Sequence, residues 1–247
     1  LADVDARIAP THYYAQHMQQ RTGVSADRIH TIYNGLDTAG YEERGQLPSP
    51  HRIGFLARVC PAKGIDTLID AFIHLRTALG DTSTRLMIAG AMTRVDHKHM
   101  DAHKARLEKA GLWQDVECNP NVSKTEKQAL LSSCSLLSVP ADYDEAFGLY
   151  MAEALLSGLP VVQPDRGAFP EIVAASGGGL LHRPGDAEHL AQQWQTILQD
   201  SELNARLSRA GRAFALREFA VTTMAERMLA TYTEICRRGP GSAMGKG

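Results

Sequence analysis

Two glutamates lie on either side of a short apolar turn in the stretch DEAFGLYMAE. Seven residues separate Glu145 from Glu153, so helical periodicity does not place them on one face, and we expect them to serve separate tasks. A carboxylate can accept two hydrogen bonds side by side, which suits the vicinal hydroxyls of a ribose or a hexose. Taken singly, each has a plainer interpretation, Glu145 as an acid at a helix start and Glu153 as a solvated helix charge.

The apolar turn between the two glutamates is expected to start a helix. A predicted strand over 135–140 and an acidic loop come before it, and Phe147, Gly148 and Leu149 form the start itself. The first N–H groups of a helix have no partner within that helix, and they favour an anion. The sequence therefore predicts an anion-binding turn just after Glu145.

Two cations occur in the loop ARVCPAKG, which follows the predicted strand 52–57. Gly64 lets the backbone turn tightly into the next helix. Arg58 and Lys63, placed before a helix N-terminus, suit a phosphate or a diphosphate. Two solvated surface charges are the alternative interpretation.

The further stretch GLPVVQPDRGAFPEIV carries two glycines and one glutamate whose roles the sequence indicates. Gly158 is expected to end a helix, and Gly167 lets the chain approach a ligand closely. Glu171 follows Pro170 at the start of the next helix, where an acid is favourable through the helix dipole alone. We prefer that interpretation for Glu171.

Three histidines in DHKHMDAHK raise the question of a metal site. His99 and His103 are four residues apart and would point the same way on a helix. Asp96 and Asp101 are the acids nearest in sequence, and they do not complete a convincing ligand set. We therefore expect His97, His99 and His103 to lie on a solvated, charged helix and predict no metal site.

Short aliphatic runs alternate with longer amphipathic stretches along most of the chain. The expected strands cover 52–57, 85–90, 115–119, 135–140, 159–164 and 179–182, and the expected helices cover 65–79, a charged stretch reaching 111, 124–133, 148–157, 170–175 and 186–198, followed by two more helical stretches that end near 237. This alternation predicts an α/β fold with a doubly wound parallel sheet, covered by helices on both faces. Ligands of such sheets bind at the carboxyl ends of the strands.

The composition is that of a globular protein, with 247 residues, 44% hydrophobic residues and a net charge of −2. Neither a basic stripe for nucleic acid, nor a membrane-spanning run, nor a signal peptide is evident. The four cysteines lie far apart, which predicts reduced thiols and a cytoplasmic location. The chain starts at Leu1 rather than Met, which suggests processing or a fragment.

Together these motifs resemble the retaining glycosyltransferases of family 4, also called group 1, which have the GT-B fold. The resemblance is carried by NGLD, GFLARVCPAKGIDTLIDAF, LMIAG, EAFGLYMAEALLSGLPVVQPDRGAFPEIV and GGGLLHRPGDAEHLA, and it extends from about Ala6 to Cys236. Such enzymes have two Rossmann-like domains that face each other across a cleft, one for the nucleotide-sugar donor and one for the acceptor.

The resemblance implies that this chain is the donor half of such an enzyme. Residues 1–36 would be a remnant α/β unit of the acceptor domain, 37–51 a linker, and 52–218 the Rossmann-like donor-binding domain. Residues 219–238 would form a C-terminal helix crossing back toward the acceptor domain, and the glycine-rich tail 239–247 would be disordered. The implied partners are the nucleotide-sugar donor and the missing acceptor domain, and that absent domain would be the part able to attach to a membrane.

The resemblance also assigns catalytic roles to three residues. Arg58 and Lys63 would bind the donor diphosphate and offset the negative charge that grows as it leaves. Glu145 would contact the transferred sugar near its reacting carbon.

The remaining donor contacts follow by resemblance as well. Phe147, Gly148 and Leu149 would offer N–H groups to the sugar or phosphate, and Glu153 would bind the ribose hydroxyls. The loop at Asn121 and Val122 would meet the base through backbone atoms, and residues 165–168 would line the sugar pocket.

The implied reaction is transfer of a hexose from a nucleoside diphosphate sugar, such as a UDP-sugar, to an acceptor hydroxyl with retention and without a metal or cofactor. One alternative is a nucleotide-sugar-binding module without turnover, and we expect this chain alone to be inactive. Another is a metal-dependent enzyme that uses Asp142 and Asp144 as an Asp-x-Asp motif. For these two aspartates we prefer a solvated acidic loop.

Overall fold

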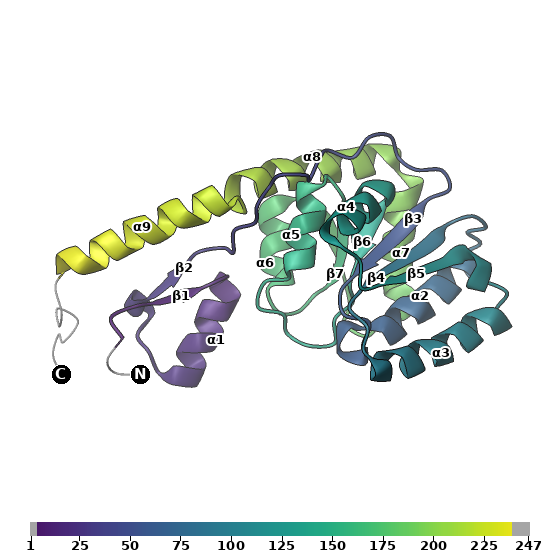
Figure 1. Ribbon diagram of the computed structural model, residues 1–247, viewed down its shortest axis with the longest axis horizontal. Helices are drawn as coiled ribbons and strands as arrows, with labels where there is room; N and C mark the ends of the chain where they lie inside the picture. The colour runs from purple at the N-terminus through teal and green to yellow at the C-terminus, as the bar shows by residue number, and fades with distance from the viewer. Residues whose placement is uncertain (1–3, 239–247) are drawn as a thin grey trace.

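A six-stranded parallel sheet with helices on both faces forms the main body of the protein (Figure 1). The computed structural model describes residues 4–238. The strands are β3 (Arg52–Leu56), β4 (Arg85–Gly90), β5 (Val116–Pro120), β6 (Leu136–Ser138), β7 (Val161–Pro164) and β8 (Gly179–His182). The helices are α2 (Ile65–Thr77), α3 (Arg94–Lys109), α4 (Lys124–Ser133), α5 (Leu149–Leu156), α6 (Phe169–Ser176), α7 (Ala187–Gln199), α8 (Ser201–Glu218) and α9 (Val221–Arg238).

The order of the strands is β5-β4-β3-β6-β7-β8, and all neighbours are parallel. From β3 the chain builds the sheet outward in one direction, through α2 to β4 and through α3 to β5. Helix α4 then brings it back to β6, and the second half grows in the opposite direction. The order therefore reverses between β3 and β6, and the crevice outside such a switch point is where open α/β sheets bind ligands.

The helices divide between the two faces of the sheet as right-handed crossovers require. Helices α2, α3 and α7 pack together on one face, and α8 packs on α5 and α6 on the other. The predicted α/β fold with a doubly wound parallel sheet is confirmed.

The core is built from the apolar faces that the sequence pattern predicts. In α2, Leu68, Ile69, Phe72 and Leu75 are buried as expected, whereas Leu79 lies beyond the helix end and is only partly buried. Burying one such side chain contributes about 1.5–3 kcal/mol. The packing of α2 fixes the loop that precedes it, which carries Lys63.

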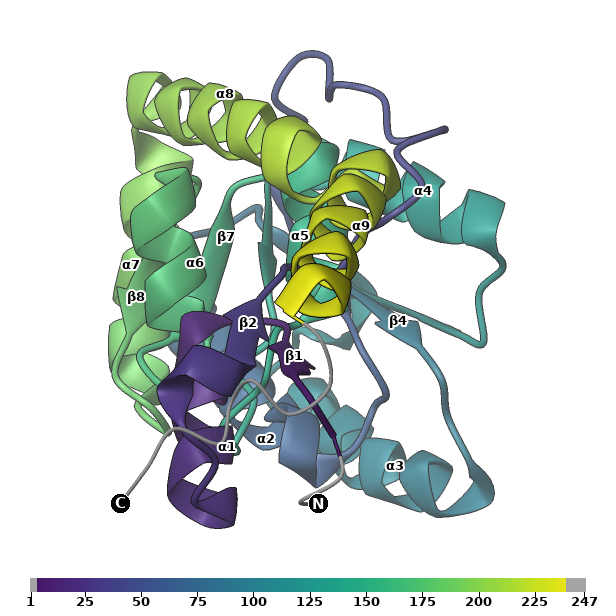
Figure 2. The ribbon, with the colours of Figure 1, turned by 90° about the vertical axis from the view of Figure 1, so that its left-hand side faces the viewer.

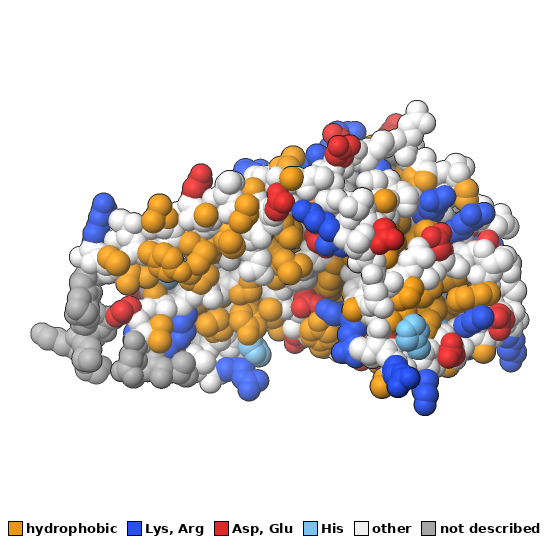
Figure 3. Space-filling view, in the orientation of Figure 1, with side chains coloured by type: hydrophobic (Ala, Val, Ile, Leu, Met, Phe, Trp, Pro, Cys, Tyr) orange, Lys and Arg blue, Asp and Glu red, His pale blue; other side chains and the backbone are white. Residues whose placement is uncertain are grey.

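A small unit at the N-terminus stands beside the main body (Figure 2). It consists of β1 (Arg7–Ala9), α1 (His12–Thr22) and β2 (Ile29–Thr31), with β1 and β2 paired in parallel. Helix α9 runs from the main body to this unit, and Ile8, Tyr232 and Ile235 line a groove where the two meet. Figure 3 shows hydrophobic side chains gathered over this part of the molecule.

Residues 37–51, expected to be a linker, form no helix or extended strand, yet the segment packs on the main body. Tyr41 is buried, and the Arg44 guanidinium donates to the carbonyl of Ser135 at 2.8 Å. The tail 239–247, expected to be disordered, lies outside the described residues. Within residues 4–238 no helix is both long and apolar enough to cross a membrane, and the four cysteines are free.

Candidate functional site

The loops that follow β3 and β6 meet at the switch point of the sheet. Gly64 makes this possible, because it has φ 74° and a Cβ at this position would lie 1.8 Å from the carbonyl oxygen of Pro140. The N–H of Asp142 also donates to the carbonyl of Ala62 at 2.9 Å. The backbones are therefore in direct contact, and the side chains carried by the two loops must face one another.

The contact between the loops brings Lys63 to Glu145. The Nζ atom of Lys63 donates to Oε2 of Glu145 at 2.6 Å, and it also donates to the Tyr143 hydroxyl. The rings of Tyr143 and Tyr150 lie under the ammonium, with centroids 4.8 Å and 5.0 Å away. Such cation–π contacts favour a cation here.

Lys63 is charged despite its partial burial. Burial favours the neutral amine, but the hydrogen bonds to Glu145 and Tyr143 outweigh it, so the pKa of Lys63 is raised. Burial also raises the pKa of Tyr150 and of Tyr143, so both phenols are neutral donors. Both donate to Oε2 of Glu145, at 3.3 Å from Tyr150 and 2.7 Å from Tyr143.

Helix α5 begins next to this cluster, and Gly148 at φ 84° turns the chain into it. Its first N–H groups have no partner within the helix. Phe147 is buried and packs on Phe219 with ring centroids 5.2 Å apart, while Leu149 is half-exposed. The structure therefore places the predicted anion-binding turn beside Lys63 and Glu145.

The loop 165–168 closes behind Glu145. Gly167, at φ 60°, lies so close that a Cβ would be 2.7 Å from the backbone nitrogen of Glu145. The N–H of Ala168 donates to the carbonyl of Glu145 at 2.9 Å. This loop supports the backbone at Glu145.

Arg58 lies in the same loop as Lys63, but its guanidinium is bound to α3. It donates to both oxygens of Asp96 at 3.3 Å, and Asp96 is in turn held by the hydroxyl and N–H of Thr93 at 2.7 Å. The hydrogen bonds from Thr93, and then that from Arg58, lower the pKa of Asp96 to about 2. Arg58 itself is about half-exposed, at 54%.

Glu153 is not the solvated helix charge of the plainer interpretation, because it is 92% buried, with 8% of its surface exposed. Its Oε1 accepts a hydrogen bond from the Tyr41 hydroxyl at 2.7 Å and pairs with Lys127 of α4. The hydroxyl of Tyr41 and the ammonium of Lys127 compensate for the burial of this carboxylate. Glu153 therefore faces α4 and the segment 37–51.

Asn121 and Val122 lie in the loop that follows β5. They line a cavity of about 560 Å³ together with Glu117, Glu126 and other residues of β5 and α4, and neither Lys63 nor Glu145 is in its lining. Asn121 has φ 58°, and its side-chain oxygen accepts from the N–H of Met92 at 3.2 Å. It thus ties the loop after β5 to the loop after β4.

The Asp-x-Asp stretch forms an exposed acidic loop with a partner that the sequence did not indicate. Arg166 pairs with Asp142 at 3.2 Å and with Asp144 at 2.9 Å. The hydrogen bond from Arg166 lowers the pKa of Asp144. An arginine between the two carboxylates opposes a cation in that position.

Glu171 has a further role beyond a first-turn acid of α6. Its carboxylate accepts from the N–H groups of His12 and Tyr13, at 3.0 Å and 2.8 Å, and from the Tyr33 hydroxyl at 3.1 Å. It therefore accepts from the first two N–H groups of α1, next to the N-cap Thr11, and joins the N-terminal unit to the main body.

The expectation of solvated histidines is confirmed for His97 and is wrong for His103. His97 is exposed, but His103 is 2% exposed. Its partner is Asp66 of α2, an acid that no local pattern in the sequence indicated.

Four residues of this region were missed by sequence reasoning. They are Tyr41, Lys127, Tyr143 and Tyr150. Tyr143 and Tyr150 lie within five residues of Glu145, so their proximity could have been noticed. The others come from distant elements, and only the fold brings them here.

The doubly wound parallel sheet, with the Lys63–Glu145 pair at its switch point, has the architecture of a GT-B domain. Residues 42–214 match the family model "Glycosyl transferases group 1", which covers more than half of the chain. The chain therefore belongs to the group 1 glycosyltransferases, and the predicted family is confirmed.

The relatives and solved structures agree with this assignment. The chain is 27% identical to the D-inositol 3-phosphate glycosyltransferase of Segniliparus rotundus, over 97% of this chain and 54% of that protein. It is 27% identical to the phosphatidyl-myo-inositol mannosyltransferase of Mycobacterium leprae, over 89% of this chain and 57% of that protein. The chain thus spans about half the length of these relatives.

Among solved structures, HepE of Anabaena in complex with UDP and glucose is similar in fold. It has a TM-score of 0.80 and 23% identity, covering 93% of this chain and 63% of HepE. The C-terminal domain of a group 1 glycosyl transferase from Francisella tularensis has a TM-score of 0.66 and 20% identity, covering 76% of this chain and all of that one.

Proposed function

We propose that this chain is the donor-binding half of a retaining hexosyltransferase. The full protein would transfer a hexose from a nucleoside diphosphate sugar to an acceptor hydroxyl, in the cytoplasm and without a metal ion in the reaction. The observation that carries the proposal is the contact between Lys63 and Glu145 at the switch point, beside the start of α5.

The contact between Lys63 and Glu145 indicates how a donor would be received. Glu145 holds the ammonium of Lys63 in place, and both side chains are less than one-fifth exposed. A diphosphate arriving at the start of α5 would compete for Lys63 with a larger charge and with N–H groups that favour anions. Glu145 would then be released toward the hydroxyls of the sugar.

The same arrangement would stabilise the leaving group. As the bond to the sugar breaks, charge grows on the diphosphate, and Lys63 lies where it can neutralise that charge. Arg58 would add a second cation once a phosphate draws it away from Asp96. The departing diphosphate would take the proton from the acceptor hydroxyl on the same face of the sugar.

The remaining contacts are proposed on the same basis. Glu153 would bind the ribose hydroxyls through the part of its carboxylate that Tyr41 and Lys127 leave available. Asn121 and Val122 would meet the base through their backbone atoms. A uridine nucleotide is favoured as donor because HepE is described in complex with UDP and glucose, and TarM of S. aureus in a complex that includes UDP.

Titration calorimetry with UDP on this chain and on Lys63→Ala tests the proposal. Loss of a charge-assisted bond costs about 1.5–3 kcal/mol, so we expect affinity to fall about tenfold or more. Lys104→Ala is the matched control, because this lysine is about half-exposed and its contacts, with Glu108 at 3.8 Å and over the ring of Trp113, involve no residue of the Lys63–Glu145 site. Equal UDP affinities for the wild type and Lys63→Ala would refute the phosphate assignment.

The chain by itself should act as a binding module. It spans 54% of the first relative above, and the resemblance places the acceptor site in the other domain. We expect this chain to bind UDP without releasing or transferring the sugar of a UDP-hexose, as measured by UDP release. We also expect EDTA to leave UDP affinity unchanged.

A further inference from the structure

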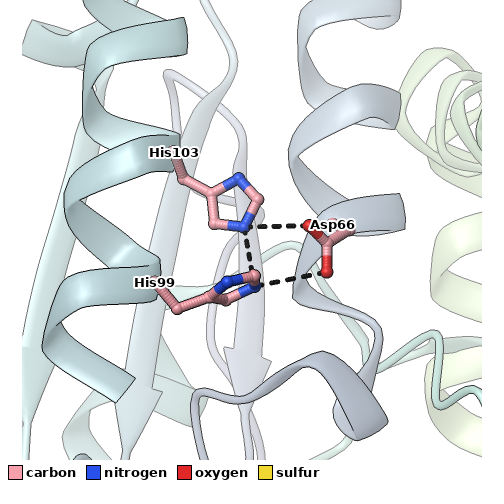
Figure 4. A group of neighbouring side chains, drawn as sticks. All are labelled: Asp66, His99 and His103. Atoms are coloured by element: carbon pink, nitrogen blue, oxygen red, sulfur yellow. Dashed lines mark hydrogen bonds and ion pairs between the residues drawn. The ribbon is translucent and has the colours of Figure 1, made fainter. Parts of the chain in front are cut away.

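A group of three side chains lies between α2 and α3, outside the Lys63–Glu145 site (Figure 4). Asp66 is in the first turn of α2, and His99 and His103 project from α3 toward it. His103 is buried, His99 is partly exposed at 29%, and Asp66 is half-exposed at 51%. One side of the group therefore opens to solvent while the other is closed by the protein.

The ligand atoms of the three residues converge on one point. The Nε2 atoms of His99 and His103 are 3.1 Å apart. The Nε2 atom of His99 is 3.3 Å from Oδ2 of Asp66, and that of His103 is 3.2 Å from Oδ1. Zinc binds nitrogen and oxygen at about 2.0–2.2 Å, so the edge of its tetrahedron is about 3.3 Å. The distance between the two nitrogens and the distance of each nitrogen from its nearer carboxylate oxygen are close to that edge, and one ligand atom from each residue lies within 4.8 Å of the others.

Local structure explains why the two rings face the same way. His99 and His103 are four residues apart on α3, so they lie one above the other on one side of the helix. The rings are nearly perpendicular, at 89°, with centroids 4.6 Å apart. They thus meet through their Nε2 edges rather than by stacking.

The chemistry of the group suits a cation. Two imidazole nitrogens that face each other at 3.1 Å can share a single proton at most, and a carboxylate adds negative charge at the same point. Two histidines and one carboxylate are a ligand set of catalytic zinc sites, which leave a fourth position for water. The open side of the group provides that position.

One neighbour must adjust when an ion binds. Arg106 Nη1 lies 3.4 Å from Nδ1 of His103, and a metal-bound His103 carries its remaining proton on that nitrogen. Arg106 is 44% exposed and is already paired with Asp70, so it can turn toward that carboxylate and the solvent.

We propose that Asp66, His99 and His103 form a binding site for a divalent transition-metal ion, zinc being the best match to the geometry. The ion would clamp α2 to α3. Both helices adjoin the loop that carries Arg58 and Lys63. Helix α2 begins two residues after Lys63, and α3 contains Asp96, the partner of Arg58. The site is separate from the proposed reaction and adds no step to it.

The test uses the whole chain freed of metal with EDTA, then titrated with Zn²⁺ by calorimetry and with Co²⁺ by visible absorption. We expect one equivalent to bind, the thermal midpoint to rise, and Co²⁺ to give the intense absorption of a four-coordinate ion. Asp66→Asn and His99→Gln should each weaken binding by more than about tenfold. The thermal midpoint of each metal-free variant is its own baseline, and the rise on adding Zn²⁺ should be smaller for both variants than for the wild type.

His97→Gln is the matched control, because His97 lies on the same helix and is exposed. It should bind the ion as the wild type does. Failure of the wild type to bind Zn²⁺ would overturn the proposal, and so would equal affinity of the wild type, Asp66→Asn and His99→Gln, since the ion would then be bound elsewhere on the chain.

Discussion

Substitution of Gly64 by alanine should open the contact between the loops after β3 and β6. Two costs add at this position. A non-glycine residue at φ 74° costs about 1–2 kcal/mol. The new Cβ would also lie 1.8 Å from the carbonyl oxygen of Pro140, so one backbone must move by more than an ångström, and such overpacking costs about 1–3 kcal/mol more.

The chain provides a control in which only the first cost applies. Gly80 has φ 73°, and a Cβ there would meet nothing within 4 Å. We therefore expect Gly64→Ala to destabilise the protein by about 1–3 kcal/mol more than Gly80→Ala. For a chain of this size, that corresponds to a thermal midpoint lower by about 2–12 °C.

Scanning calorimetry measures the thermal midpoint of each variant, and calorimetric titration with UDP measures its affinity for the nucleotide. Displacement of Pro140 moves the segment that carries Glu145, so Gly64→Ala should lose UDP affinity while Gly80→Ala keeps it. If the two variants had the same midpoint and the same affinity, the close approach at Gly64 would not be what positions Lys63 against Glu145.

The remaining predictions concern two carboxylates. Glu171→Ala removes the carboxylate that accepts from the first two N–H groups of α1, while Thr11 remains as the N-cap of that helix. It should cost about 0.5–2 kcal/mol, with faster amide hydrogen exchange in α1 and unchanged exchange in α7; equal protection of α1 in both proteins would contradict this. Asp96 has a pKa lowered from 3.8 to about 2, so its contribution to stability is complete above about pH 4 and is lost as the pH falls toward 2. Acid titration of Asp96→Asn should therefore show a shallower loss of stability in that range than the wild type, and parallel curves would refute the assignment.

The fold could be predicted because its signals are local. The apolar run of β3, the apolar face of α2 and the glycine after Lys63 each specify a strand, a helix or a turn from neighbouring residues alone. Once alternation establishes a parallel sheet, the carboxyl ends of β3 and β6 become the places to search. Lys63 and Glu145 were found in this way.

The partners of these residues could not be predicted, because they depend on which helices become neighbours. From the sequence alone, Glu153 is interpreted as a surface charge. In the structure, α4 and the segment 37–51 pack on it and supply its partners Lys127 and Tyr41. The sequence likewise predicts a solvated His103, whereas in the structure α2 places Asp66 beside it. A buried charge in a helix is identified by what packs against it, and a single sequence does not record that packing.

The reversal of strand order between β3 and β6 also has a consequence for how the protein folds. Each half of the sheet, β3-β4-β5 and β6-β7-β8, is built from crossovers between consecutive strands, whereas Lys63 and Glu145 are 82 residues apart in the chain. Bringing together residues so far apart in the chain has an entropic cost that local pairings avoid. The seam between the halves, where β3 meets β6, should therefore form last. A ligand held across the seam would stabilise only molecules in which both halves have joined, and binding would thus report the completion of folding.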